Sequence, residues 1–163
     1  MSILVRQALP EDCHALFLVE AASFPPEEAA SEASIRDRLA VFPESFFLAE
    51  EDGQIIGLIN GCASDLPRIE DRLFENAALH EPHGSNQMIF SLAVAPDARK
   101  KGIGTALLHR MIEESRQAGR KAVILTCKAE KIPFYQKAGF RNLGVSQSAH
   151  GGAVWYDMIL ELK

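Results

Sequence analysis

Runs of hydrophobic residues, separated by polar and turn-forming residues, predict most of the strands of this chain. The segments 46–50 and 55–60 flank Asp52-Gly53, a pair that favours the positive φ angles of a tight hairpin turn. The complete set of predicted strands covers residues 3–9, 46–50, 55–60, 88–94, 121–127, 140–145 and 153–162.

Hydrophobic residues at helical spacing lie between these strands. The predicted helices cover residues 10–23, 34–41, 68–79, 103–118 and 132–138. Phe24-Pro25-Pro26 ends the first helix, Ser34 is a suitable cap for the second, and Gly139 follows the last at the usual stop position. This order of elements predicts a mixed α/β fold with a central sheet.

Composition and charge narrow the class of protein. The chain of 163 residues is 47% hydrophobic, which suits one folded domain over residues 1–163. A net charge of -5 argues against nonspecific binding to nucleic acid. No apolar run approaches the roughly 20 residues of a membrane span, and no signal peptide is recognisable. Three widely spaced cysteines indicate a reducing cytoplasm, with no disulfide framework and no metal site.

The most informative segment is the basic, glycine-containing turn between the strand 88–94 and the helix 103–118. Its glycines allow the backbone N–H groups to approach a ligand, and the start of a helix attracts anions such as phosphate. Arg99, Lys100 and Lys101 add positive charge to an otherwise acidic chain. A helix cap with a solvated basic run is the simpler alternative. A Walker loop and a Rossmann fingerprint are excluded, because their lysine and third glycine are absent.

Two motifs resemble those of the GNAT superfamily of N-acetyltransferases. Arg99-x-x-Gly102-x-Gly104 after Leu92-Ala93-Val94 resembles its acetyl-coenzyme A signature, and residues 132–140 resemble its second motif. Within the superfamily, residues 20–31 and 75–94 resemble the serotonin (arylalkylamine) N-acetyltransferase family. The resemblance implies a single GNAT-like domain with a mostly antiparallel, mixed central sheet flanked by helices.

The resemblance also implies roles for particular residues. The backbone of Leu92, Ala93 and Val94 would pair with the pantetheine arm of acetyl-coenzyme A. Tyr135 would lie beside the sulfur and protonate the leaving thiolate, although a core aromatic residue would fit the same pattern. The residues that would hold the pyrophosphate are Arg99, Lys100, Lys101, Gly102, Ile103, Gly104 and Thr105.

The acceptor side departs from the resemblance. Phe24, Pro25 and Phe90 are candidates for an apolar wall around the acceptor, or for simple core packing. Vertebrate members place two histidines where this chain has Met88 and Phe90, and neither of these can take a proton. The amine could lose its proton in other ways. A water could relay the proton to another group, the small neutral fraction of the amine could react directly, or His80 or His83 in the nearby loop could act as the base.

These features together predict an enzyme. It would transfer an acetyl group from acetyl-coenzyme A to a primary amine of a small molecule, such as an arylalkylamine, by direct attack in a ternary complex. We expect no metal, nucleic acid or membrane partner, and a monomer or a homodimer. Acetylation of a peptide or protein, and coenzyme binding without catalysis, are the competing interpretations.

Overall fold

The computed structural model describes residues 3–99 and 101–163. Its strands are β1 (Ile3–Gln7), β2 (Phe46–Glu51), β3 (Gln54–Asn60), β4 (Ala63–Ser64), β5 (Asn86–Ile89), β6 (Ser91–Val94), β7 (Ala122–Cys127), β8 (Arg141–Val145) and β9 (Tyr156–Glu161). Its α-helices are α1 (Cys13–Ser23), α2 (Glu32–Val41), α3 (Asp71–Glu75), α4 (Ile103–Gln117) and α5 (Ile132–Lys137).

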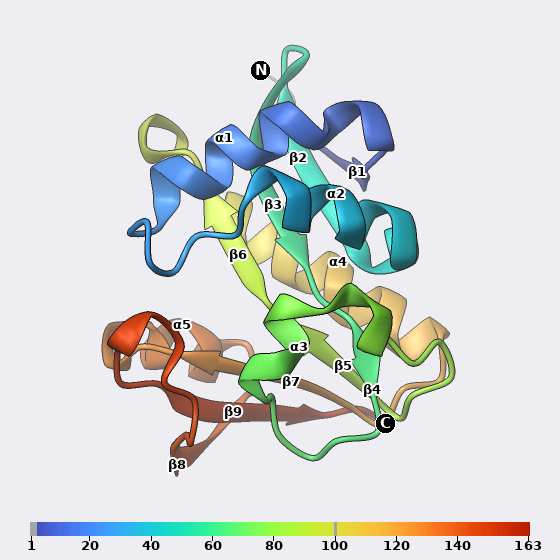
Figure 1. The fold of residues 1–163 in the computed structure, drawn as a ribbon, viewed down its shortest axis with the longest axis vertical. Coiled ribbons are helices and arrows are strands. Elements are labelled where there is room, and N and C mark those ends of the chain that lie inside the picture. The colour runs from blue at the N-terminus through green and yellow to red at the C-terminus, as the bar shows by residue number, and fades with distance from the viewer. Residues whose placement is uncertain (1–2, 100) are drawn as a thin grey trace.

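The strands form two sheets that diverge from one another (Figure 1). The first sheet has the order β1-β2-β3-β6 and is antiparallel throughout. The second has the order β4-β5-β7-β9-β8, and only its β5–β7 pair is parallel. The predicted α/β class with a mixed, mostly antiparallel sheet is therefore confirmed.

The hydrophobic run 88–94 is not one strand, contrary to the sequence prediction. It divides at Phe90, because β5 pairs with β7 of the second sheet while β6 pairs with β3 of the first. The N–H of Phe90 donates to the carbonyl of Asn60 at 2.7 Å, and the N–H of Met88 donates to that of Cys62 at 2.8 Å. Hydrophobicity alone does not show that the two halves of the run have different neighbours.

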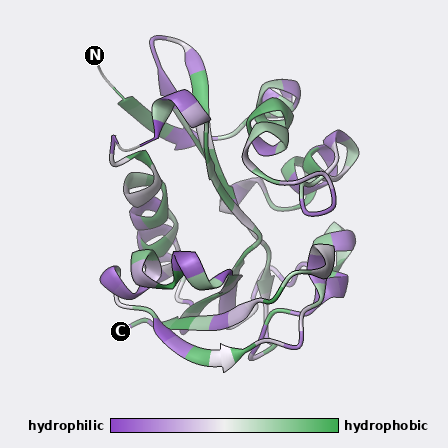
Figure 2. Cartoon of the chain, turned by 90° about the vertical axis from the view of Figure 1, so that its left-hand side faces the viewer, coloured by the Kyte–Doolittle hydropathy of each residue, from purple (hydrophilic) through white to green (hydrophobic). Residues whose placement is uncertain are grey.

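Helices cover both faces of the first sheet. In Figure 1, α1 and α2 lie in front of this sheet and α4 lies behind it, and Figure 2 shows the hydrophobic strands between these helices. Leu16 of α1 packs against Leu58 of β3 on one face, and Leu107 of α4 packs with Ile59 on the other. The sheet is thus buried on both sides.

Two predicted helices have different limits in the structure. The helix expected over 68–79 is reduced to α3 and a 3-10 turn at Ala77–Leu79, in a segment rich in charged residues and broken at Asn76. The helix expected from Ser34 begins earlier, because the Ser31 hydroxyl accepts the N–H of Ser34 at 3.1 Å. Ser31, not Ser34, is therefore the N-cap.

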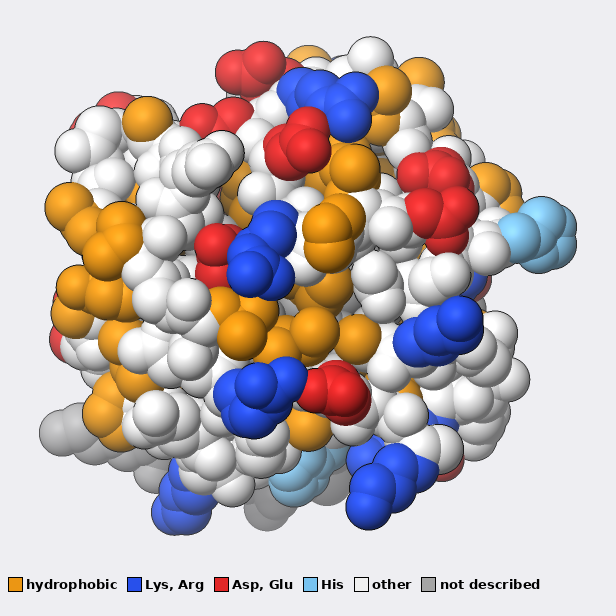
Figure 3. Space-filling view, turned by 90° about the horizontal axis from the view of Figure 1, so that it is seen from below, with side chains coloured by type: hydrophobic (Ala, Val, Ile, Leu, Met, Phe, Trp, Pro, Cys, Tyr) orange, Lys and Arg blue, Asp and Glu red, His pale blue; other side chains and the backbone are white. Residues whose placement is uncertain are grey.

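The described part of the chain contains no helix that is long and apolar enough to cross a membrane. Seen from below, the surface carries positive and negative side chains interspersed around hydrophobic ones (Figure 3). This face therefore carries no extended field of one sign of charge.

Candidate active site

A pocket of about 680 Å³ opens where the two sheets diverge. The end of α1, β6, the start of α4, the end of β7, α5 and the β8–β9 connection all contribute to its walls. It brings together most of the candidate residues found from the sequence. These are Phe24, Pro25, Phe90, Leu92, Val94, Arg99, Gly102, Ile103, Gly104, Thr105 and Tyr135.

Two of the described candidate residues, Ala93 and Lys101, are not among those that line the pocket. The side chain of Ala93 packs into the hydrophobic cluster beneath α1, so only its backbone could serve a ligand. The Lys101 ammonium lies 3.6 Å from Glu51 Oε1, outside the lining. Lys100 lies outside the described residues.

Strand β6 presents one edge to the pocket. Among the described strands it pairs with β3 alone, so it is the edge strand of the first sheet. Leu92 and Val94 line the pocket, whereas Ala93 between them points to the opposite side. An extended ligand with amide groups could therefore hydrogen-bond to this edge as an added strand.

The glycine turn forms part of the pocket wall at the start of α4. Gly102 caps α4 with a φ of 77°, and a Cβ atom there would meet open space. Gly104, in the first turn of α4, would place a Cβ 3.6 Å from the Phe134 ring. Arg99 Nε donates to the Val94 carbonyl at 3.1 Å, which holds its guanidinium near the end of β6. The backbone N–H groups at this helix start fit a pyrophosphate.

Tyr135 lies in α5, on the far side of the pocket from α1. Its ring makes edge contacts with Phe134 and Phe140 at centroid distances of 5.0 and 5.7 Å, and the residue is only 8% exposed. Burial raises the pKa of its hydroxyl, so the group keeps its proton at neutral pH. The protonated hydroxyl can therefore act as a donor toward a group in the pocket.

Several lining residues escaped the sequence analysis, chief among them Glu20 and His150. Glu20 is 3% exposed and lies on the buried face of α1 with Cys13 and Leu16. The sequence does contain a sign of this position, because Glu20 follows the helical spacing of the apolar residues that form the buried face of the helix. Nothing in the local sequence of His150 marks it, because it reaches the pocket through the irregular β8–β9 connection.

Three loops meet at one side of the pocket. Lys128 Nζ lies 2.7 Å from Glu28 Oε2, and His150 Nε2 lies 2.9 Å from the carbonyl oxygen of Glu28. A Cβ at Gly151 would lie 2.5 Å from Glu28 Cγ, so only glycine fits this approach. We call the contacts among Glu28, Lys128 and residues 150–151 the roof. The roof joins the α1–α2 loop to the β7–α5 connection, which carries Lys128, and to the β8–β9 connection.

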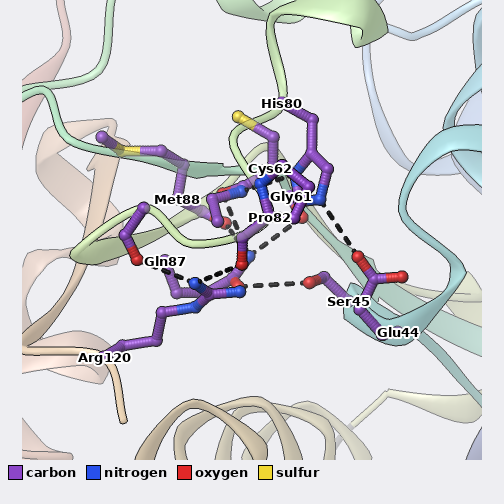
Figure 4. Close-up of polar contacts among 11 residues, drawn as sticks. Glu44, Ser45, Gly61, Cys62, His80, Pro82, Gln87, Met88 and Arg120 are labelled. Atoms are coloured by element: carbon purple, nitrogen blue, oxygen red, sulfur yellow. Dashed lines mark hydrogen bonds and ion pairs between the residues drawn. The ribbon is translucent and has the colours of Figure 1, made fainter. Parts of the chain in front are cut away.

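None of Met88, Phe90, His80 and His83 both lines the pocket and can take a proton. Met88 is fully buried and packs in a hydrophobic cluster outside the pocket lining, while Phe90 lines the pocket. His80 and His83 also lie outside the lining. Figure 4 shows that the His80 ring instead belongs to a polar cluster near the start of the second sheet, with Glu44 and Arg120.

The contacts of His80 define a structural role. Its Nδ1 accepts the N–H of Ala63 at 3.0 Å, so Nε2 carries the proton and donates to Glu44 Oε1 at 3.0 Å. Burial lowers the pKa of His80, and Arg120 lowers it further, whereas Glu44 and Glu81 oppose the shift. Protonation of Nδ1 would break the contact with Ala63.

We expect the stability of the protein to fall on acidification partly through His80. Because its pKa is lower in the folded state, the unfolded state takes up the proton first. The stability that neutral His80 contributes is fully present above the pKa of histidine in the unfolded chain. It is lost as the pH falls through the lower pKa of His80 in the folded protein. His80→Leu should cost about 1–2 kcal/mol at pH 7.5 and flatten the dependence of unfolding free energy on pH.

Urea unfolding between pH 7.5 and 5 measures both effects. His83→Leu is the matched control, because His83 is an exposed histidine in the same loop. If the unfolding free energies of wild type and His80→Leu change with pH in parallel, protonation of His80 does not contribute to the loss of stability in acid.

The sequence model of the acetyltransferase (GNAT) family matches residues 6–140. The chain therefore belongs to the GNAT acetyltransferase family. It is 28% identical over 163 residues to a serotonin N-acetyltransferase of Mesocricetus auratus, covering 97% of this chain and 77% of the relative. It is 29% identical over 144 residues to an N-alpha-acetyltransferase of Sulfurisphaera tokodaii, covering 86% and 72%.

Solved structures share the same fold. A GNAT-like decarboxylase, GphF, in complex with isobutyryl-CoA superposes with a TM-score of 0.86. It is 21% identical, and the match covers 98% of this chain and all of the other. At this identity the likeness establishes the fold and not the reaction.

Proposed function

We propose that this protein transfers an acetyl group from acetyl-coenzyme A to the primary amine of a small molecule. The observation that carries the proposal is the composition of the pocket. The edge of β6, the glycine turn of α4 and Tyr135 line one cavity, and they suit the pantetheine arm, the pyrophosphate and the sulfur of the coenzyme in turn.

The fit to the coenzyme rests on the backbone of this chain. The N–H groups of residues 102–105 would hold the pyrophosphate, with Arg99 beside them, and the free edge of β6 would pair with the amides of the pantetheine arm. The bound thioester supplies an electrophilic carbonyl carbon. A backbone N–H of β6 would stabilise the negative charge that develops on its oxygen.

The reaction then needs a proton at the sulfur. Tyr135 holds its proton at neutral pH, because burial raises its pKa, and it lines the same cavity. We assign it the protonation of the leaving thiolate. Cys127 also lines the cavity, but burial raises the pKa of its thiol to about 11. A covalent acetyl-cysteine is therefore not part of the proposal.

The roof favours a small acceptor over an extended peptide. Glu28, Lys128 and His150 join three loops at the pocket, and a peptide chain would have to pass between them. Phe24, Phe74, Phe90 and Trp155 line the remaining space and suit a hydrophobic or aromatic body. An arylalkylamine has this combination of a primary amine and an aromatic ring.

Calorimetry with acetyl-coenzyme A, followed by thiol release with a panel of amines, tests the proposal. We expect coenzyme binding and faster thiol release with phenethylamine or tryptamine than with amino acids or polyamines. A preference for peptide N-termini would instead place the activity with that of the N-alpha-acetyltransferase relative. Coenzyme binding without transfer to any acceptor would contradict the proposal.

A further inference from the structure

Acetylation of an amine needs a group that removes the proton of the incoming ammonium. A primary alkylamine is almost entirely protonated at pH 7 and cannot attack a carbonyl carbon in that form. Neither Met88 nor Phe90 can serve, and His80 and His83 lie outside the pocket lining. The group must therefore be sought among the other residues of the pocket.

Glu20 is a buried carboxylate with only one of its two oxygens paired. Its Oε2 accepts the N–H of Ala30 at 3.0 Å, which fixes the side chain against the α1–α2 loop. Its Oε1 has no partner that meets hydrogen-bond geometry among the described residues, although the residue is only 3% exposed and the Ser91 side chain is close enough to lower its pKa. A buried carboxylate oxygen without a partner costs free energy unless a ligand satisfies it.

The position of Glu20 joins two cavities. It lines the main pocket and also a second one of about 150 Å³, between the α1–α2 loop, α2 and α3. Phe74, Phe90 and His150 line both cavities as well. The Phe74 ring stacks on His150 at 4.8 Å and lies 5.0 Å from Phe90. Aromatic side chains thus line the space that Glu20 shares between the two cavities, and the Phe90 ring already has the Arg38 guanidinium 4.9 Å from its centroid.

The charges around Glu20 leave its carboxylate available. The Arg38 guanidinium donates to Asn60 Oδ1 and to the Phe74 carbonyl, both at 3.1 Å, and the Lys128 ammonium is paired with Glu28. Burial raises the pKa of Glu20, against the opposing effects of the Ala30 N–H, Arg38, Ser91 and His150. A carboxylate with a raised pKa is a better match for a proton from an amine.

We propose that Glu20 Oε1 binds the acceptor ammonium and takes its proton, at the junction of the two cavities. This inference rests on the proposed function. The neutral nitrogen then forms the C–N bond to the thioester carbon, and the C–S bond breaks. The second nitrogen-bound proton reaches the thiolate by way of the Tyr135 hydroxyl, and Glu20 releases the first to solvent.

A matched pair of amines tests the proton-accepting role. The β,β-difluoro analogue of phenethylamine is much less basic, because fluorine withdraws electron density from the amino group. Glu20→Gln should lower kcat/KM about 100-fold for phenethylamine and only a few-fold for the difluoro analogue. Glu32→Gln is the control, because it removes a carboxylate from the neighbouring helix outside both cavities. Equal losses for the two amines would overturn the role.

Binding to the enzyme saturated with free coenzyme A tests Glu20 without turnover. Glu20→Gln should weaken phenethylamine binding about tenfold or more and leave the binding of neutral 2-phenylethanol unchanged. If the variant shows this loss of phenethylamine binding but the wild type shows no turnover, Glu20 binds the ammonium and the proposed acetyl transfer is contradicted. Phenethylamine binding that is absent in the wild type, or unaffected by the variant, would overturn the inference.

Folding of the variants is checked by thermal melting. If Glu20→Gln does not fold, Glu20→Asp replaces it, since it keeps the carboxylate but withdraws the oxygen from the junction. Glu20→Asp should keep much of the ammonium affinity and lose most of the rate with phenethylamine. A rate equal to that of the wild type would count against the assigned geometry.

Discussion

Tyr135→Phe should lower kcat about 100-fold and leave the affinity for acetyl-coenzyme A nearly unchanged. The substitution removes only the hydroxyl, and the ring contacts with Phe134 and Phe140 remain. The loss should therefore appear in the chemical step, because the thiolate would leave without a proton donor. Steady-state kinetics and calorimetry on the same preparation measure the two quantities.

Tyr156→Phe is the control for Tyr135→Phe. Tyr156 is the other tyrosine of the chain and lies at the start of β9, outside the pocket lining. Its variant should keep the activity of the wild type. An unchanged rate in Tyr135→Phe, or an equal loss in both variants, would remove Tyr135 from the mechanism.

Gly61→Ala should destabilise the protein by about 3 kcal/mol or more. A Cβ at Gly61 would lie 1.8 Å from the Met88 carbonyl oxygen and 2.9 Å from the Ile89 Cα. These are backbone atoms of β5, so a side-chain rotation cannot relieve the clash. Gly61 follows β3 at the place where the two sheets begin to diverge, and the strain would fall on that junction.

Gly53→Ala distinguishes this clash from the general cost of replacing a glycine. Gly53 has a φ of 82°, but no atom lies within 4 Å of a Cβ built there. Its variant should lose only about 1 kcal/mol, from backbone strain. Chemical unfolding measures both variants, and similar losses in the two would mean that β3 and β5 can separate without cost.

The wall of the pocket that we assign to the coenzyme could be located from the sequence, because its residues are close together in the chain. Residues 92–105 form a strand, a turn and a helix start in succession, and most of them line one wall. The acceptor side was not predictable in the same way. Glu20, Phe74 and His150 come from three distant segments, and only the tertiary fold places them together.

The division of the 88–94 run escaped prediction for a related reason. Every residue of that run except Ser91 is hydrophobic, which suits one continuous strand. Pairing with β3 on one side of Phe90 and with β7 on the other is a long-range choice. Local propensity contains no information about which neighbour each half selects.

The burial of Cys127 has a practical consequence for inhibitor design. Its sulfur borders the space where Tyr135 lies, yet with a pKa of about 11 almost none of it is thiolate at pH 7. Weak electrophiles such as acrylamides should label it slowly, unless a tightly bound scaffold holds the warhead against it. Covalent probes for this enzyme would therefore gain selectivity from their reversible affinity and not from their intrinsic reactivity.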